Sequence, residues 1–591
     1  MLNHLVEYTT KKGLDSEPGF TTRSVRWLLE LSLDGQLVNV LPLGDDKRAE
    51  QTPGCPDMHN MTAGGRAHFL VETLQTVALF CTPGKIASSK EKCSFFMNMI
   101  GLAALNIPVL QPLARFMDDA QQQEALRNRL TKEKAKPTDW LRWSIAGSDP
   151  LKRQEVLDWW RQWRVTDQKN GKQESKPKKG KTNALEADVK HAAMICFLTG
   201  DKMQPLPTHP KITGLSGVGG LGTGDVMVGF DKDAFCSFGL QQAGNAAMSE
   251  TAVRQYIDAL NHLIKNHSRK LANALVIHWF KEAVRPEDDP VSFLHEPPEL
   301  TEAAAQSSAR EILESLRSGQ RPVPVNNRYY ALTISGASGR VMMRDWMEGS
   351  FEELIIKIGQ WFSDLEIVAR DGGNPAPEPK FMAVCGALVR ELKDLQAQTA
   401  TTLWRVALTG RPIPQSFIAQ AMTRFRCDLI DDKSFNHARM GLMKAYFIRK
   451  GGTHNMSAYL NKEHPEPAYQ CGRLLAVLAG LQRSALGDVG AGVVQRYYVS
   501  ASQTPGLTIG RLVSNAKNHL NKLDGGLAFW YEDQISEIMS HIQDRIPATL
   551  DLERQSLFAL GYYQQIAANR AGSKENNTNE NTNESKEGGN Q

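Results

Sequence analysis

Period-two hydrophobic patterning marks the start of the chain. Apolar and mixed positions alternate over residues 25–33, and a second apolar run covers 37–43. Asp34-Gly35 lies between them and supplies the positive φ angles that a type I′ turn requires, so the pattern predicts a β-hairpin. Residues 51–66 are rich in proline, glycine and polar side chains. They predict a long loop that leads into a strand at 67–74.

Helical spacing follows, and then a polar gap. Apolar positions recur with helical periodicity from about residue 90 to 163. The lysine-rich residues 167–183 contain no apolar anchor, so burial cannot offset their ordering entropy and a mobile linker is predicted. The Asn- and Glu-rich residues 572–591 predict a disordered tail for the same reason.

Strand and helix signals mix in the middle of the chain, and helices alone follow. Strands are predicted at 193–198, 226–230, 272–280, 329–334 and 340–343, with helices at 251–265, capped by Ser249, and at 351–362. Later segments with helical periodicity are 381–409, 413–431, 436–450, 467–484, 508–523, 527–545 and 551–570. The fold class expected is an α+β N-terminal portion with mixed or antiparallel sheets, followed by an all-α C-terminal helical bundle.

Length agrees with several domains. A chain of 591 residues exceeds what one hydrophobic core supports. The expected parts are an α+β region at 1–165, a linker at 166–184, a second α+β region at 185–375, a helical bundle at 376–571 and a tail at 572–591.

Composition narrows the class of protein. A net charge of +4, from 69 basic and 65 acidic residues, argues against a coating protein of the histone kind but permits a local basic groove. The start of the sequence lacks a signal-peptide pattern, and no apolar stretch is long enough to span a membrane, which predicts a cytoplasmic protein. The eight cysteines form no C-x-x-C pair and no zinc spacing, so buried reduced thiols and no metal are expected.

Enzyme signatures are absent from the sequence. It contains no Walker A loop, H-E-x-x-H, G-x-S-x-G or paired metal-binding carboxylates. Residues 217–222 match G-x-G-x-x-G, but a strand pattern rather than a helix follows, so a dinucleotide cofactor is rejected and no cofactor is expected. For the alternative of a nuclease, the candidate bases are His209, His262 and His519.

Two loops carry candidate binding residues. Residues 214–224 contain six glycines, so this backbone either approaches a phosphate or base edge closely or forms a flexible surface hairpin. The candidates in this loop are Lys211, Gly217, Gly219, Gly220 and Gly222. The loop before Phe69 either reads base edges through side-chain donors or is an ordinary polar connection. Its candidates are Asn60, Thr62, Gly64, Gly65, Arg66 and His68.

Basic residues in the helical half form a third candidate set. They either solvate an exposed face or line a groove that follows a single strand. The set is Arg473, Arg483, Arg496, Arg511, Lys517 and Lys522.

Several ordered blocks lie between about residues 200 and 565. They are His209-Pro210-Lys211-Ile212-x-Gly214, Asn245-Ala246, 259–263, 329–334, Arg344-x-Trp346-x-Glu348-Gly349, 468–478, Arg496-Tyr497-Tyr498, Ala501-Ser502-x-Thr504-Pro505 and 558–563. Together these blocks resemble the large subunit of type I-C CRISPR systems, the Csd family. No single block is decisive, and the ordered set is specific.

The resemblance implies a non-enzymatic role in Cascade, an antiviral surveillance complex. The implied partners are CRISPR RNA, target double-stranded DNA, a guide-processing subunit, backbone subunits, small subunits and a helicase-nuclease. Base pairing with the guide reads most of the sequence, while the protein reads the protospacer-adjacent motif and stabilises the displaced strand in the R-loop. The loops 60–68 and 211–224 become the leading DNA contacts. The second is richer in glycine than expected of the family, which favours backbone contact or wedging.

The resemblance also implies a small subunit made from the same gene. Arg449-Lys450-Gly451-Gly452 can be encoded with a ribosome-binding sequence (AAA-GGA-GG) just before Met456, which predicts a second polypeptide of 136 residues, 456–591. The alternative is that Lys-Gly-Gly only ends a helix. For the whole chain, the alternatives are a nuclease and a helical adaptor that binds no nucleic acid.

Overall fold

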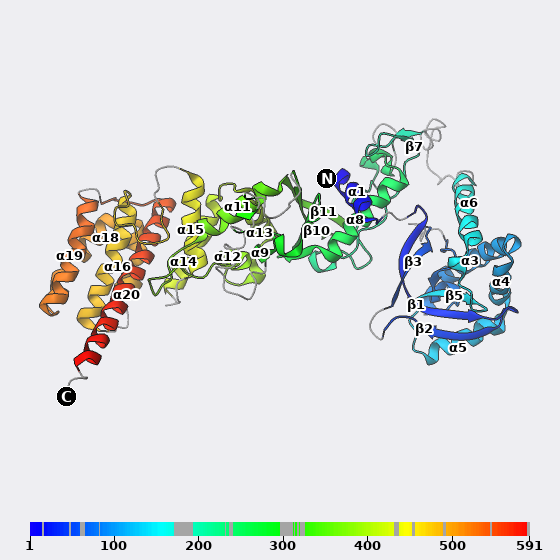
Figure 1. Ribbon diagram of the computed structural model, residues 1–591, viewed down its shortest axis with the longest axis horizontal. Helices are drawn as coiled ribbons and strands as arrows, with labels where there is room; N and C mark the ends of the chain where they lie inside the picture. Colours follow the sequence, from blue (N-terminus) through cyan, green and yellow to red (C-terminus); the bar gives the residue numbers. More distant parts are fainter. Residues whose placement is uncertain are drawn as a thin grey trace. The chain divides into compact units, whose positions relative to one another are not determined.

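The chain divides into two compact units in the computed structural model (Figure 1). Unit 1 comprises Met1–Ser216, Gly220–Asn266 and Gly336–Met342, and unit 2 comprises Gly217–Gly219, His267–Ser335 and Met343–Gln591. The structure describes every residue except 15–16, 46–48, 59–64, 82, 171–192, 231, 236–239, 241, 296–310, 312–313, 316–317, 319–325, 431–435, 452–455, 488–491, 544–545 and 588–591.

A mixed five-stranded sheet organises the first part of unit 1. Its strands are β1 (Phe20–Leu31), β2 (Leu37–Pro42), β3 (Glu50–Pro56), β4 (Glu72–Thr73) and β5 (Trp140–Ile145). They run in the order β2-β1-β5-β4, with β3 also on β1, and only the β1–β5 pair is parallel. The predicted hairpin is confirmed as β1–β2, in which Trp27 pairs with Pro42 and Leu31 with Leu37.

Four helices complete the hydrophobic core of this part. They are α3 (Ile86–Asn106), α4 (Gln111–Asp118), α5 (Ala120–Lys132) and α6 (Gln154–Asn170). Alternate residues of β1 are buried, as its period-two pattern predicts, and they share a core with Phe96, Phe116, Trp143 and Trp160.

The sequence-based assignment fails at three strands of this sheet. β3 lies in the predicted loop 51–66, and β5 lies in the predicted helical stretch. The strand expected at 67–74 is reduced to the two residues of β4, followed by the short helix α2 (Leu74–Val77). Both missed strands, β3 and β5, form because they pair with β1. Pairing with a strand that is distant in the sequence has little effect on local hydrophobic periodicity, so the sequence pattern did not show it.

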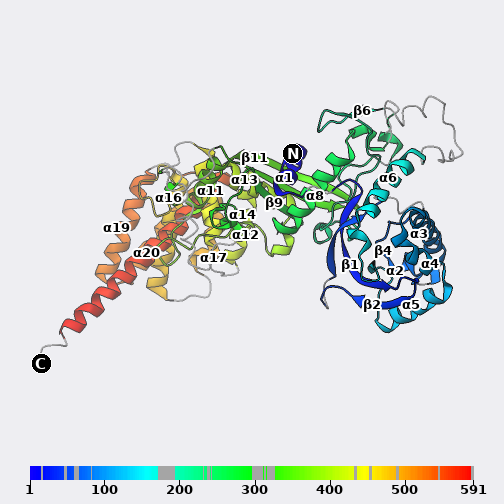
Figure 2. The same cartoon turned by 45° about the vertical axis from the view of Figure 1, so that its right-hand side comes forward.

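The rest of unit 1 is built around helix α8 (Glu250–Asn266). Ser249 caps it, because the Ser249 hydroxyl accepts a hydrogen bond from the Ala252 amide at 3.2 Å. Helix α1 (Leu2–Lys12) lies beside α8 (Figures 1 and 2). There the Thr9 hydroxyl donates to the Gln255 carbonyl at 2.6 Å. A small hairpin, β6 (Met194–Ile195) with β7 (Lys202–Met203), precedes α8. The strand expected at 226–230 is wrong: only isolated bridges form, at Asp225 and Val226.

An antiparallel sheet, most of which belongs to unit 2, follows in the order β11-β10-β9-β8. Its strands are β8 (Ser268–Leu271), β9 (Ala274–Phe280), β10 (Arg328–Ala337) and β11 (Arg340–Ser350). Ser338 and Gly339, with φ of 49° and 86°, form the tight turn between β10 and β11. Ser350 caps α11 (Phe351–Leu365) through the Glu353 amide.

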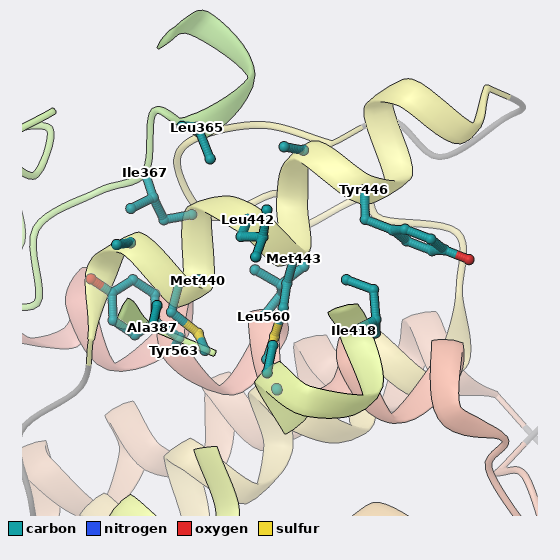
Figure 3. Packing of buried hydrophobic residues seen from close by; sticks show 14 of the residues in the cluster. Leu365, Ile367, Ala387, Ile418, Met440, Leu442, Met443, Tyr446, Leu560 and Tyr563 are labelled. Atoms are coloured by element: carbon teal, nitrogen blue, oxygen red, sulfur yellow. The ribbon is translucent and has the colours of Figure 1, made fainter. Parts of the chain in front are cut away.

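Helices account for the rest of unit 2, as predicted. They are α12 (Phe381–Gly386), α13 (Ala397–Thr409), α14 (Gln415–Ile430), α15 (His437–Lys450), α16 (Pro467–Leu486), α17 (Val493–Gln503), α18 (Pro505–Leu520), α19 (Gly525–Ile542) and α20 (Leu552–Glu587). Figure 3 shows the core around α15, whose Met440, Leu442 and Met443 pack with residues such as Ile418 and Leu560.

The predicted helix 381–409 is broken in two, and the tail expected at 572–591 is helical as far as Glu587. A helix already nucleated in a bundle adds residues at little cost, which explains the longer end of α20.

Glycines allow α16 and α20 to touch through their backbones. A Cβ added to Gly472 of α16 would lie 2.0 Å from the Phe558 carbonyl oxygen of α20. A Cβ added to Gly561 of α20 would lie 2.2 Å from the Tyr469 carbonyl oxygen of α16. Any side chain at either position must push the helices apart.

We therefore expect Gly472→Ala and Gly561→Ala each to destabilise the helical bundle by about 1–3 kcal/mol or more, since overpacking strains a dense core. Gly510→Ala is the matched control. Gly510 is an exposed residue of α18, and a Cβ added to it would meet no atom within 4 Å, so alanine should stabilise the helix by about 0.5–1 kcal/mol. Thermal unfolding of the three variants measures the predicted losses of stability and the predicted gain. Equal melting temperatures would contradict the close contact.

Candidate nucleic-acid interface

The loop before Phe69 has a closed neck. The Met58 amide donates a hydrogen bond to Nδ1 of His68 at 3.1 Å, so residues ten apart in sequence meet at its base. Its candidates Asn60, Thr62 and Gly64 lie outside the described residues. His68 is only 12% exposed, and its ring also lies beside Asp57 and Trp140. The structure therefore places His68 in the neck of the loop, and not among donors open to a base.

A buried ion cluster anchors this neck. Asp57 precedes Met58, and its two carboxylate oxygens accept hydrogen bonds from Arg23 at 2.6 Å and from Arg254 of α8 at 2.7 Å. The Arg23 guanidinium also lies over the Trp140 ring, 4.0 Å from its centroid. Two arginines on one buried carboxylate fix the position of the loop firmly, because separating them would leave buried charge unpaired.

Arg66 forms a two-point ion pair. Nη1 and Nη2 of Arg66 donate to the two oxygens of Asp167, near the end of α6, at 2.7 and 3.1 Å. The Arg66 side chain is 26% exposed, and the Phe95 ring lies beneath its guanidinium. Gly65 has a φ of 66° and lies against Glu91, so the loop comes close to α3 here. A base edge or phosphate that binds these donors would compete with Asp167.

The glycine-rich loop is closed and internally bonded. Ile212 and Asp225 bridge its two ends in antiparallel fashion. The buried Asp225 carboxylate accepts hydrogen bonds from the Leu221 amide, with both oxygens at 3.2 Å. A Cβ added to Gly220 would lie 2.3 Å from that carboxylate. Gly220 therefore makes room for Asp225 and is not itself a free contact.

The remaining glycine candidates are open. Lys211, Gly217, Gly219 and Gly222 are exposed. Just beyond the loop, the Val226 amide donates to the Gly339 carbonyl and the Val341 amide donates to the Val226 carbonyl, each at 2.8 or 2.9 Å. The exit from the loop is thus held against the β10–β11 turn. Only a single 3₁₀ turn, Ser216–Val218, occurs in the loop, so a helix that could hold a pyrophosphate does not follow the glycines.

Both loops are tied to α8. Besides Arg254, which holds Asp57, Asn261 of α8 accepts hydrogen bonds at its Oδ1 from the Thr213 amide at 2.9 Å and from the Thr213 hydroxyl at 3.3 Å. Two loops that are about 150 residues apart in sequence therefore share one helix as their support.

Arg473 is not a surface contact. It is fully buried, and its guanidinium donates to the side chains of Gln470, Gln565 and Glu537 and to the Lys462 carbonyl, at 2.8–3.0 Å. Burial alone would raise the pKa of Glu537, but the hydrogen bonds from Arg473 and Lys462 outweigh it and lower that pKa. The prediction that Arg473 lines a groove is corrected: its charge holds α16, α19 and α20 together. The apolar residues around Arg473 in the sequence do not show whether its charge is exposed or is paired inside the bundle.

The other five basic candidates are exposed. Arg483 lies on α16, Arg496 on α17 and Arg511 and Lys517 on α18, with Lys522 just after α18. Among the described residues none of the five forms an ion pair. Residues 489–523 contain four Lys or Arg and no Asp or Glu, so this segment alone carries as much net positive charge as the whole chain. Exposed, unpaired cations without nearby acids in sequence favour a polyanion.

Two of the three histidines named for the nuclease alternative, His209 and His262, lie in unit 1, each against a tyrosine. Burial lowers the pKa of His209 to about 4, so its ring is neutral at pH 7, with Nδ1 2.7 Å from the Tyr256 hydroxyl. His262 contacts the Tyr8 hydroxyl, and burial lowers its pKa as well. His519 lies on α18 of unit 2. Within the described ranges, no three His, Cys, Asp or Glu residues gather as a metal site would require.

Six residues that position the candidate site were not predicted: Arg23, Asp57, Asp167, Asp225, Arg254 and Asn261. Arg254 and Asn261 carried a usable signal, since each is a polar residue between buried apolar ones on α8: Arg254 lies between Val253 and Tyr256, and Asn261 between Leu260 and Leu263. Asp167 and Asp225 carried no such signal in the sequence, because only the folded chain brings each of them to its hydrogen-bond partner.

Comparison with known families identifies the family of the chain. A model of the family described as CRISPR-associated protein (Cas_Csd1) matches residues 5–569 of the 591. The match spans both units, and no curated protein matches the chain. The chain belongs to the Csd1 family of CRISPR-associated proteins, the large-subunit family of type I-C systems. Over the described residues, no helix is both long and apolar enough to cross a bilayer.

If the exposed cations follow a single strand, Arg511→Ala and Lys517→Ala should each reduce the slope of log K against log salt by about 0.7, because each removes one phosphate contact. Binding should weaken equally for all sequences. Lys393→Ala, an exposed lysine outside α16–α18 that pairs with Glu391, is the control and should change nothing. Titrations of the assembled complex at several salt concentrations measure the slopes. Unchanged slopes in both variants would remove the assignment.

Proposed function

We propose that this chain is the large subunit of an RNA-guided surveillance complex, in which it recognises the protospacer-adjacent motif in double-stranded DNA. The observation that carries the proposal is the shared anchoring of the two candidate loops on α8. A rigid pair of loops suits a rigid ligand such as the duplex edge, since sequence beyond the motif is read by guide pairing. The open glycines of the 211–224 loop favour backbone contact with the duplex.

The second part of the proposal concerns the opened duplex. The acid-free segment 489–523, with its exposed cations, suits the displaced strand and would stabilise the R-loop. Membership of the family supports a place beside CRISPR RNA and the other subunits of such a complex. Recruitment of the helicase-nuclease belongs to the same proposal and follows from the family resemblance alone.

Binding of the assembled complex to duplexes that differ only beside the target tests the proposal. The complex should prefer one adjacent motif, and complexes that lack this polypeptide should lose the preference. Equal target choice without it would contradict the proposal. Cleavage of RNA or DNA by the isolated chain would instead support the nuclease alternative, which no structural observation favours.

Arg66 allows a sharper test with a matched pair of variants. Arg66→Ala should weaken binding to motif-bearing DNA by about 1–3 kcal/mol and relax motif preference if the guanidinium reads a base edge. Asp167→Asn removes the charge of this ion pair but keeps the arginine, so residue 167 competes less strongly for the guanidinium and affinity should be retained or increased. If both variants weaken binding alike, the ion pair is only structural and Arg66 is not a reader.

The small-subunit prediction can be tested separately. Residues just after Met456 bond mainly within the 456–591 segment: the Ser457 and Ala458 carbonyls accept from Gln564, and the Lys462 carbonyl accepts from Arg473. Gly451 also ends α15, which agrees with the alternative interpretation of Lys-Gly-Gly and is compatible with an internal start. Mass spectrometry of the purified complex should show a polypeptide of residues 456–591 that disappears in Met456→Leu. No such polypeptide, or its survival in that variant, would exclude the internal start.

A further inference from the structure

Arg254 and Asn261 occupy one face of α8. They are seven residues apart, which in an α-helix corresponds to two turns and about 10 Å along the axis. Arg254 holds the neck of the first loop through Asp57, and Asn261 holds Thr213 at the start of the glycine-rich loop. The helix thus determines how far apart the two loops begin.

The helix is well suited to keep that distance constant. Nine of its 17 residues are buried, and Thr9 of α1 is bonded to its backbone. The glycine-rich loop also approaches it closely, because a Cβ added to Gly214 would lie 2.7 Å from Cγ2 of Ile264 and Gly214 has a φ of 90°. Neither Asn261 nor Arg254 belongs to either loop, so their effect on a ligand must pass through the loops that they hold.

We infer that α8 acts as a spacer, and that Asn261 is a positioning residue that makes the two loops bind one duplex as a single surface. The inference rests on the proposed function and adds that the contributions of the loops are coupled. If Asn261 releases Thr213, the glycine-rich loop loses its fixed distance from the first loop. Contacts from Lys211 then no longer add to those from Arg66.

A double-mutant cycle in the full complex measures this coupling. In the parent, Arg66→Ala and Lys211→Ala should each weaken binding to a motif-bearing duplex, by about tenfold for Arg66 and severalfold for Lys211. In an Asn261→Ala background, Lys211→Ala should have no further effect, while Arg66→Ala should retain its full effect. Asn261→Asp is the matched control, since its carboxylate can accept both hydrogen bonds from Thr213 and should restore the Lys211 effect.

Each result decides between the possibilities. If Lys211→Ala is as harmful in Asn261→Ala as in the parent, α8 does not couple the loops and the inference is overturned. If both loop variants bind like the parent, the proposed duplex contact itself fails. If Asn261 only stabilised the fold, the Arg66 and Lys211 effects would fall together. Should Asn261→Ala not fold, Gly214→Ala provides the same test, because a methyl group there displaces the loop from Ile264.

Discussion

A buried carboxylate needs hydrogen-bond donors or a cationic partner, and the structure of unit 1 depends on how Asp57 meets this need. Its partners, Arg23 and Arg254, come from a strand and a helix more than 200 residues apart in sequence. Either arginine alone could neutralise the carboxylate, but loss of Asp57 would leave two cations in a low-dielectric surrounding, at a cost far above that of a surface ion pair. The neck of the first candidate loop is therefore fixed by electrostatics.

The need of buried polar groups for partners also explains why some candidate residues have structural roles in the fold. His68 and Gly220 stood in polar or glycine-rich surroundings that resemble binding sites in a sequence, and Arg473 stood as a charge in a hydrophobic stripe. In the fold, His68 closes a neck, Gly220 gives room to the Asp225 carboxylate, and Arg473 bonds to side chains of three helices. A sequence shows that a donor or a glycine is present, but its partner is fixed by tertiary contacts. Arg511 and Lys517, by contrast, are exposed, as expected for charged residues on the polar face of a helix.

Local signals predicted the hairpin β1–β2, the cap of α8 and nearly every helix after residue 380, because each depends on neighbours within a few residues. They failed for β3 and β5, whose strand character comes from pairing with β1. They also failed at 381–409, where one periodic stretch is broken into α12 and α13. For the candidate site, the sequence identified the two loops but not their shared support, since Asn261 and Arg254 are separated from their partners by 48 and 197 positions.

Two of the blocks that carry the family resemblance acquire a physical reason in unit 2. Gly472 and Gly561 lie in the blocks 468–478 and 558–563, and each glycine faces a carbonyl of the other helix. Arg473, next to Gly472, bonds to Gln565 of the same partner helix. These blocks are thus the two halves of one helix–helix contact, and they say nothing direct about nucleic acid. The residues that the proposed function assigns to nucleic acid lie outside these two blocks: they are the exposed cations of α17 and α18 and the loops on α8. Arg496, Arg511 and Lys517 are exposed and take no part in this contact, so a change in their charge should leave the packing of α16 against α20 intact.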